Sequence, residues 1–347
     1  MRHPSSTTLL ALLALCAACA PDSAVEPGTP DLPPPAAARV PLPGSFTVAV
    51  YPVDGWFADV NRANLAVGMG NGGAIALPQG GPMHFMASGP GRIARALAVN
   101  NSGIIVGGVS PNCCAWVDLS PAVWTSFGAT PVVLPDSGEA VDVNDRGMVV
   151  GTVLRRGRDR AFAWDAPAGS LVLLPTLPGG RRTTARAINN EEVILGTAED
   201  LKGIVYTVLW RRGATGWTVQ VVGGGIDGLD LDGWLGVVGV TTGRASFGKP
   251  DHAGWYATAG ASQAEAVSPG GALAVGTDWG AATTWPQTTI GFIADRSGRI
   301  TWLPFPSGSM WRASFGSGVT DCGLVVGTVW ELGSVFTAQP AVWNPGC

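Results

Sequence analysis

The fold is decided by a ten-residue stretch that recurs along the chain, Ala98-Val99-Asn100-Asn101-Ser102-Gly103-Ile104-Ile105-Val106-Gly107. The apolar residues Ala98-Val99 end one predicted strand, and the apolar run Ile104-Ile105-Val106, closed by Gly107, begins the next. Between the two runs, Asn side chains can bond nearby backbone groups, and Gly103 tolerates a positive φ angle. The stretch therefore predicts a β-hairpin.

Copies of this hairpin occur along the whole chain. Four good copies begin at Asp59, Asp142, Ala187 and Gly318, and two degraded copies begin at Leu231 and Ala266. Each copy closes on a glycine, and these closing glycines are residues 68, 107, 151, 196, 239, 276 and 327. Subtracting successive numbers gives spacings of 39, 44, 45, 43, 37 and 51 residues. A period in the low forties built from strand signals is typical of a propeller blade.

Two further phrases complete the repeated unit. One is an apolar strand that ends in Trp, as at Trp124, Trp164, Trp210 and Trp343. The other is a short strand that ends in Leu-Pro, as in residues 132–135, 171–175 and 300–304. With the hairpin, these phrases give four strands per unit, which is the number that a blade needs.

The order of these phrases resembles the bacterial extracellular HAF-repeat family. The closest stretches are residues 161–164 (Ala-Phe-Ala-Trp) and 174–180 (Leu-Pro-Thr-Leu-Pro-Gly-Gly), while residues 252–255 keep the His but not the Phe. The resemblance covers roughly residues 56–343 and implies an exported β-repeat protein. The family carries no well-defined catalytic residues to transfer to this chain.

The chain ends predict how the ring closes. Residues 45–51 form an alternating strand with no hairpin before them, and the seventh unit stops after its third strand, at Trp343. We therefore expect an all-β, seven-bladed propeller over residues 45–347, in which the N-terminal strand completes the last blade. Closure removes two open sheet edges. Because the fifth unit is short, six or eight blades, or an open β-repeat array, are the alternatives.

The first 44 residues predict export. Residues 1–19 combine Arg2 and His3 with a short apolar run and end in small residues before Cys19, which resembles a lipoprotein signal with Cys19 as the lipidated residue. The alternative is an ordinary signal peptide cut near Ala20. Residues 20–44 form a Pro/Ala-rich linker, which suits either a membrane tether or a disordered N-terminus without a function. We expect an outer-membrane or cell-surface lipoprotein, or a secreted protein.

Four cysteines follow the signal: Cys113, Cys114, Cys322 and Cys347. An even number in an exported protein suggests disulfides. We expect a Cys322–Cys347 bond beside the closure seam, because both residues lie in the last unit. Cys113 and Cys114 would then form a vicinal disulfide, with a redox or metal role as the alternative.

Three groups of residues are candidate sites, and each has a structural alternative. Calcium could bind at Asp227, Asp230 and Asp232, although the EF-hand spacing is absent. An anionic glycan or phosphate group could bind the arginines of the third and fourth units, which otherwise are solvated loop tips. Sugar rings could stack on tryptophans that break the repeat register, which otherwise are core. The arginine and tryptophan candidates are Arg156, Arg158, Arg182, Trp279, Trp285, Trp302 and Trp311.

Composition limits the function classes. The formal net charge of −4 gives no reason to expect a nucleic-acid partner, and only 13% of residues are charged. No Ser-nucleophile or His-rich metal motif is present, so the sequence predicts no cofactor and no assigned catalytic residue. We expect a monomeric, non-enzymatic binding or scaffolding propeller for a cell-surface protein or glycan, with membrane contact only through the lipid anchor. The alternative is a carbohydrate-active enzyme, a hydrolase or lyase, with two acidic residues beside Trp platforms.

Overall fold

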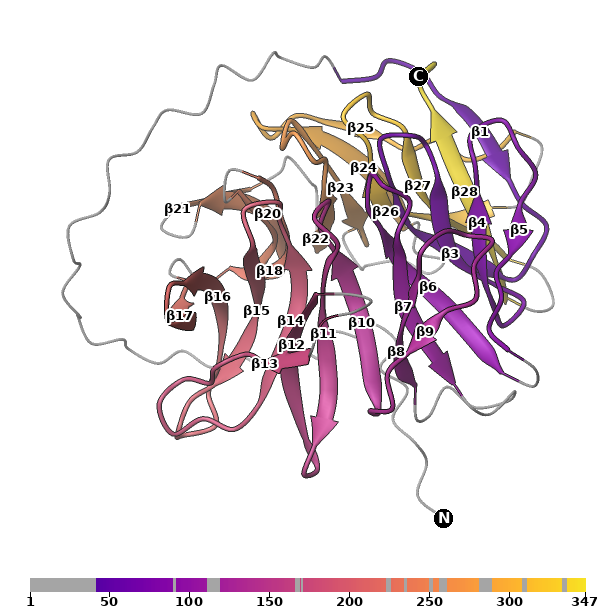
Figure 1. Ribbon diagram of the computed structural model, residues 1–347. Helices are drawn as coiled ribbons and strands as arrows, with labels where there is room; N and C mark the ends of the chain where they lie inside the picture. Colours follow the sequence, from indigo (N-terminus) through magenta and orange to yellow (C-terminus); the bar gives the residue numbers. More distant parts are fainter. Residues whose placement is uncertain are drawn as a thin grey trace. The chain divides into compact units, whose positions relative to one another are not determined.

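The computed structural model describes residues 42–89, 92–110, 119–165, 169, 171–222, 226–233, 236–249, 252–255, 261–280, 289–307, 311–332 and 336–347. These residues all belong to one compact unit, Ala37–Cys347. They form strands β1 to β28 and connecting turns (Figure 1). Within these ranges, no helix is long and apolar enough to cross a bilayer.

The strands group into seven antiparallel sheets of four strands each. Each sheet is a blade, numbered here from the N-terminus. Blades 1 to 3 contain β2 (Gly55–Val60), β3 (Ala66–Gly70), β4 (Gly73–Leu77), β5 (His84–Phe85), β6 (Ile93–Val99), β7 (Ile105–Ser110), β8 (Ser120–Trp124), β9 (Val132–Val133), β10 (Gly138–Val143), β11 (Met148–Arg155), β12 (Arg158–Asp165) and β13 (Leu171–Leu173).

Blades 4 to 6 contain β14 (Thr183–Ile188), β15 (Val193–Glu199), β16 (Val205–Gly213), β17 (Gly216–Val221), β18 (Asp227–Leu231), β19 (Val237–Thr241), β20 (Arg244–Lys249), β21 (His252–Trp255), β22 (Ser262–Val267), β23 (Leu273–Asp278), β24 (Ile290–Asp295) and β25 (Ile300–Trp302). Blade 7 contains β26 (Trp311–Val319), β27 (Val325–Leu332), β28 (Phe336–Asn344) and β1 (Thr47–Val50).

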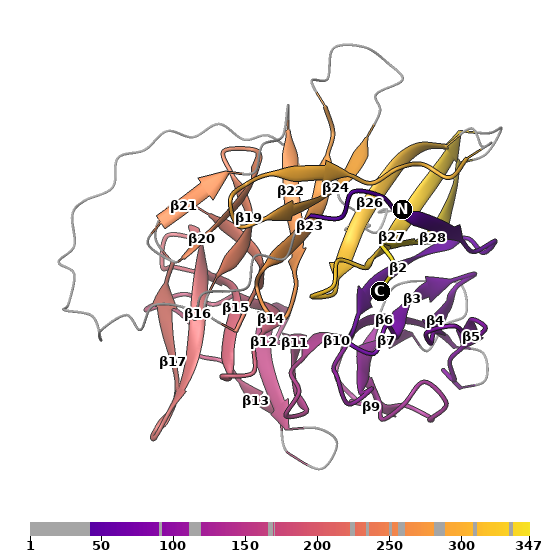
Figure 2. The ribbon, with the colours of Figure 1, turned by 90° about the horizontal axis from the view of Figure 1, so that it is seen from above.

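Seven blades stand in a ring, as the sequence predicts. In Figure 2, the first strands of blades 1 to 4, 6 and 7 surround the middle of the view. The ring closes because β1 pairs with β28, with Val48 opposite Trp343 and Ala49 opposite Val342. Blade 7 also bonds to blade 1, since the Thr328 hydroxyl donates to the Gly55 carbonyl at 2.9 Å. The predicted Cys322–Cys347 disulfide is present beside this seam, with a Cα–Cα distance of 6.1 Å.

The short fifth unit still forms four strands. The second and third strands of blade 5 are joined by the two-residue turn Thr242-Gly243, where both φ angles are positive. Its fourth strand is β21, which pairs with β20. Short second and third strands and short connections, and not a missing strand, explain the 37-residue spacing. Seven four-stranded sheets exclude the six- and eight-bladed alternatives.

Each closing glycine of the repeat faces a β-bulge in the first strand of its blade. The register shifts in the first strand of every blade, between Ala140 and Asp142 in blade 3 for example. A Cβ atom on any closing glycine would overlap a backbone carbonyl oxygen of that strand, such as the Glu139 oxygen opposite Gly151. Glycine therefore recurs because the bulged backbone approaches too closely for a side chain.

The strand-ending tryptophans form part of the core between blades. Trp124, Trp210 and Trp343 are fully buried. Their indole N–H groups donate to backbone carbonyls in the loop that follows the preceding blade, at 2.7–2.8 Å: Trp124 to Ala87, Trp210 to Pro175 and Trp343 to Pro304. Trp210 and Trp343 thus bond to the proline of a Leu-Pro motif, because a buried indole N–H needs an acceptor, while Trp164 donates to the Gly169 carbonyl of its own blade at 2.9 Å.

Candidate functional site

Asparagines of the repeated hairpin link neighbouring blades around the axis. The buried side chain of Asn100 accepts bonds from the Ser102 and Ile104 N–H groups and so shapes its own turn. Its Nδ2 atom donates to the Asn144 carbonyl oxygen of the next blade at 2.9 Å. Asn61, Asn144 and Asn189 repeat this pattern at 2.9–3.2 Å, so blades 1 to 5 are joined by one chain of hydrogen bonds.

The same position holds Asp232 in blade 5, and an arginine replaces the missing amide donor. The Asp232 side chain is 4% exposed, and its Oδ2 atom accepts a bond at 2.9 Å from Arg296, which lies in the turn between β24 and β25. Arg296 also donates to the Gly271 carbonyl oxygen. The ion pair therefore ties blade 5 to blade 6 where an Asn cannot.

In blades 1, 3 and 5, an aspartate lies two residues before the Asn or Asp of the turn, and its carboxylate points to the axis. These aspartates are Asp59, Asp142 and Asp230, which directly follow the bulges of β2, β10 and β18. In each, Oδ1 accepts the N–H of the following residue at 2.7 Å. The Oδ2 atoms accept N–H groups of the next blade at 2.6–2.9 Å, from Val99, Ile188 and Val267.

Burial raises the pKa values of these three carboxyl groups. Burial raises the pKa of Asp59 despite the lowering effect of its two backbone hydrogen bonds. Burial, and then the charges of Asp230 and Asp59, hold the pKa of Asp142 well above its usual range. Burial also raises the pKa of Asp230 to about 7, against its backbone hydrogen bonds and with the charges of Asp59 and Asp232 adding to the shift. The three groups therefore repel one another across a common space.

That space is a cavity of ≈ 150 Å³ at the Asn-turn end of the axis. All three carboxylates line it, and Asp145 and Asp232 lie at the same cavity. Burial works against ionisation of Asp145, but hydrogen bonds from Asn101 and Asn190 and the charge of Arg62 lower the pKa of its carboxyl group overall. Among the described lining residues there is no Lys or Arg, so the cavity is strongly acidic. It can accommodate several waters or one small organic cation.

The calcium candidates do not share one site. Asp227 pairs with Arg186 at 2.5 Å and is exposed, Asp230 faces the axis, and Asp232 pairs with Arg296. Within the described ranges, no group of three His, Cys, Asp or Glu side chains is arranged to hold a metal ion. The acidic lining of the axial cavity offers negative charge and hydrogen-bond acceptors to a cation.

The other candidate residues lie away from the axis. The exposed side chains of Arg156, Arg158 and Arg182 lie at or beside the hairpin tips of blades 3 and 4. The tryptophans are dispersed: Trp279 is half-buried, Trp302 is 42% exposed and contacts Phe292 edge-on, and Trp311 packs against the core of blade 7. Trp285, Cys19, Cys113 and Cys114 lie outside the described residues.

Sequence reasoning missed Asp59 and Asp142, and it grouped Asp230 with the wrong neighbours. The signal was available in the first position of the repeated stretch. Read around the ring, this position alternates, with Asp59, Ala98, Asp142, Ala187, Asp230, Ala266 and finally Gly318. Polar residues at alternate copies of one register position point to a shared axial environment, because blades repeat the same geometry.

Comparisons with known proteins add likeness of fold only. No family model matches the chain, and no curated protein matches it. Among solved structures, it is similar to TolB from Acinetobacter baumannii at 12% identity and a TM-score of 0.48, over 70% of this chain and 64% of TolB. It is also similar to an arginine-to-alanine triple mutant of AofleA from Arthrobotrys oligospora (7% identity, TM-score 0.39, 87% of this chain and 89% of that one). A third is the WD40 domain of SCAP from fission yeast (9% identity, TM-score 0.31, 87% and 98%).

Proposed function

We propose that this protein is an exported, non-enzymatic binding propeller whose axial cavity takes a cationic group of its ligand, a protonated amine or a guanidinium. The observation that carries the proposal is the cavity itself, with five carboxylates and, among its described lining residues, no basic side chain. The Cys322–Cys347 disulfide supports export, since such bonds persist in oxidising compartments. We retain lipidation at Cys19 and membership of the HAF-repeat family as parts of this proposal.

Charge favours a cation over a neutral sugar. Three carboxylates with raised pKa values repel one another in a partly desolvated space, and a cation placed between them relieves that repulsion. A bound cation would therefore also lower the pKa values of all three groups. Ammonium and guanidinium groups supply hydrogen-bond donors as well as charge, which matches lone pairs of the carboxylates and of the Asn101 and Asn190 amide oxygens.

The geometry favours binding over glycoside hydrolysis. A hydrolase on this ring needs two acidic groups beside an aromatic platform for the sugar. The acidic groups are present, but the described residues that line the cavity include no aromatic side chain. Both oxygens of each axial carboxylate are already engaged with backbone N–H groups, which is suited to a fixed binding charge.

The test is calorimetric titration of the full chain with N-acetylarginine amide, with the neutral isostere N-acetylcitrulline amide as the control ligand. Because the axial carboxylates must be ionised to attract the cation, we expect one site for the arginine ligand at about pH 8 and at least roughly tenfold weaker binding at about pH 5.5. The citrulline ligand should not bind. Asp142→Ala and Asp230→Ala should each weaken arginine binding at least roughly tenfold. Alanine is a suitable replacement because blades 2, 4 and 6 carry Ala98, Ala187 and Ala266 at the same position.

Asp227→Ala is the matched control variant, because Asp227 is on the same strand as Asp230 but does not line the cavity. It should bind like the unmodified chain. Equal affinity for the arginine and citrulline ligands, or unchanged affinity in both axial variants, would overturn the proposal. Calcium that competes fully with the arginine ligand would identify a metal site instead, and would also overturn it.

A further inference from the structure

A second surface, which shares no residue with the lining of the axial cavity, combines exposed aliphatic and basic side chains. It lies at the β15–β16 hairpin of blade 4, where Leu201 is 78% exposed, Val205 62% and Ile204 49%. Lys202 lies between these residues in the turn and is also exposed. In the corresponding hairpin of blade 3, Leu154 is 49% exposed beside Arg155 and Arg156. We call these two hairpin ends the blade 3–4 tips.

The turn at the tip of blade 4 is fixed by hydrogen bonds to the side chain and the carbonyl group of Asp200. The Asp200 Oδ1 atom accepts the N–H groups of Lys202 and Ile204 at 2.8 and 2.9 Å. Gly203 has a φ of 81° and donates its N–H to the Asp200 carbonyl oxygen. The Asp200 carboxylate is thus used to shape the turn. Leu201 and Lys202 project from a fixed loop, which lowers the entropy that a partner must remove.

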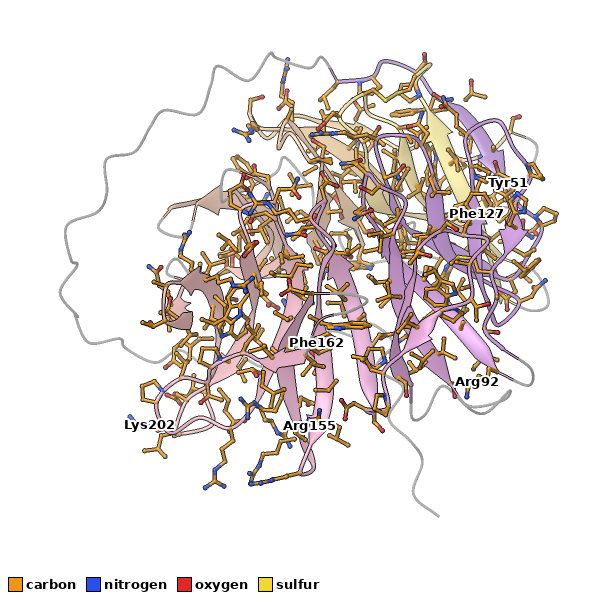
Figure 3. All side chains as sticks on the ribbon, in the orientation of Figure 1. Tyr51, Arg92, Phe127, Arg155, Phe162 and Lys202 are labelled. Atoms are coloured by element: carbon orange, nitrogen blue, oxygen red, sulfur yellow. A yellow bond between two sulfur atoms is a disulfide. The ribbon has the colours of Figure 1, made fainter. Side chains whose placement is uncertain are left out.

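The loop between blades 3 and 4 adds charge to the same tips. The Arg182 carbonyl oxygen accepts the Glu199 N–H at 3.0 Å, and Gly179 lies against the Leu201 side chain. On the other side, the Thr183 hydroxyl accepts the Ala161 N–H of β12 at 2.9 Å. These bonds place Arg181 and Arg182 between the two hairpins. Figure 3 shows Arg155 and Lys202 at the same edge of the ring.

The charge of this edge is positive although that of the chain is negative. The cations are Arg155, Arg156, Arg158, Arg160, Arg181, Arg182 and Lys202, and the anions are Asp136, Asp159, Glu199 and Asp200. Seven minus four leaves a formal charge of +3, against −4 for the chain. Arg155 pairs with Asp136. None of Arg156, Arg158, Arg181, Arg182 and Lys202 forms an ion pair with any residue in the described ranges.

We propose that the blade 3–4 tips bind the surface of an anionic phospholipid bilayer. Lipid phosphates complement the guanidinium and ammonium groups of these five residues, and the acyl boundary takes the Leu201, Ile204 and Leu154 side chains. A polyanionic glycan would satisfy the charges but would leave the aliphatic side chains in water, so the apolar contribution favours the bilayer. The membrane contact is thus not limited to an anchor at Cys19, and the inference does not depend on the axial cavity.

The test is co-sedimentation of the full chain with vesicles of phosphatidylcholine alone or mixed with phosphatidylglycerol. The chain carries Cys19→Ser, so that no lipid anchor contributes. We expect binding to the anionic vesicles only, weakening with salt. The double variant Arg158→Gln/Arg182→Gln should bind at least roughly tenfold less well, since each basic residue near the surface contributes about 1 kcal/mol. Leu201→Ser/Ile204→Ser should bind at least roughly fivefold less well at unchanged net charge.

Two control variants match these changes at other places. Arg62→Gln/Arg146→Gln removes the same charge from two Asn turns. These turns precede the second strand of a blade, whereas the blade 3–4 tips follow the second strand, at its opposite end. Phe85→Ser removes a side chain that is 56% exposed on blade 1. Both controls should bind like the parent chain.

The proposal is overturned if the parent chain does not co-sediment with anionic vesicles, or if the tip variants bind them as well as the control variants do. Binding to soluble polyphosphate that competes with vesicles and is indifferent to Leu201→Ser/Ile204→Ser would assign the tips to an anionic polymer instead, and would also overturn it.

Discussion

At the first position of the repeated stretch, a single side chain serves the fold and the candidate site together. The Asp142 carboxylate accepts hydrogen bonds from N–H groups of its own blade and of the next one, so it links the backbones of the two blades. The same carboxylate lines the axial cavity, where burial and the neighbouring Asp230 and Asp59 raise its pKa. The stabilising hydrogen bonds and the unfavourable charge are therefore two consequences of one placement.

The stability of the unliganded propeller should consequently fall as the pH rises. A carboxyl group with a raised folded-state pKa contributes stability below its unfolded-state pKa and loses it as the pH rises through the folded-state value. For Asp230 the window runs from about 4, the unfolded pKa, to a folded-state pKa of about 7. We expect a higher melting temperature at about pH 5 than at about pH 8, and a smaller difference in Asp230→Ala. A pH dependence identical in Asp230→Ala and Asp227→Ala, measured by calorimetry, would contradict this assignment.

At the scale of the element, the hairpins between the second and third strands of blades 1, 3 and 5 share one turn geometry. Both central residues have positive φ in Asn71-Gly72, Arg156-Gly157 and Thr242-Gly243, as type I′ turns require. Of these three turns, that of blade 1 has the preferred Asn-Gly pair. Thr242 has a φ of 51°, and this conformation is strained for a β-branched residue. The two-residue connection between β19 and β20 imposes this conformation although Thr242 itself disfavours it.

Thr242→Asn should therefore stabilise the protein. Asparagine tolerates the left-handed conformation, so we expect the free energy of unfolding to increase by about 0.5–1.5 kcal/mol. Loss of the hydrogen bond from the Thr242 hydroxyl to the Thr241 carbonyl oxygen offsets part of this gain. Denaturant titration measures this change. Asn71→Thr, at the matching position of blade 1, should destabilise by a similar amount, and the prediction fails if the two substitutions shift stability in the same direction.

At the scale of the molecule, an odd number of blades prevents the Asp/Ala alternation from closing. Blade 7 adjoins blade 1, which carries Asp59, and the position holds Gly318 instead. A Cβ atom there would lie 3.0 Å from the Asp59 Cα atom. The seam is held by other means: β1 against β28, the Cys322–Cys347 disulfide, and the Arg62–Asp321 ion pair. Exposed ion pairs contribute little, so the strand and the disulfide dominate.

Ring closure can be weakened selectively through β1. Val48 and Val50 face the core of blade 7, while Thr47 and Ala49 are exposed on the same strand. We expect Val48→Asp/Val50→Asp to lower the free energy of unfolding by about 3–6 kcal/mol through lost apolar burial, and to speed amide exchange in β28. Thr47→Asp/Ala49→Asp, with the same added charge, should have little effect. Equal protection of β28 in both variants would show that β1 does not close the ring.

The sequence by itself predicted seven blades, with six or eight as alternatives, and it predicted the closing strand and the Cys322–Cys347 bond. The blades follow from hydrogen bonds and steric limits within one hairpin, which the chain repeats seven times, while the closing strand and the disulfide follow from the position of their residues in the last unit. Only the tertiary structure brought Asp59, Asp142 and Asp230 to one cavity and Arg182 to the tips of blades 3 and 4. Those placements follow from how far the bulged strands turn toward the axis and how the inter-blade loops fold back, and no local pattern encodes such distances.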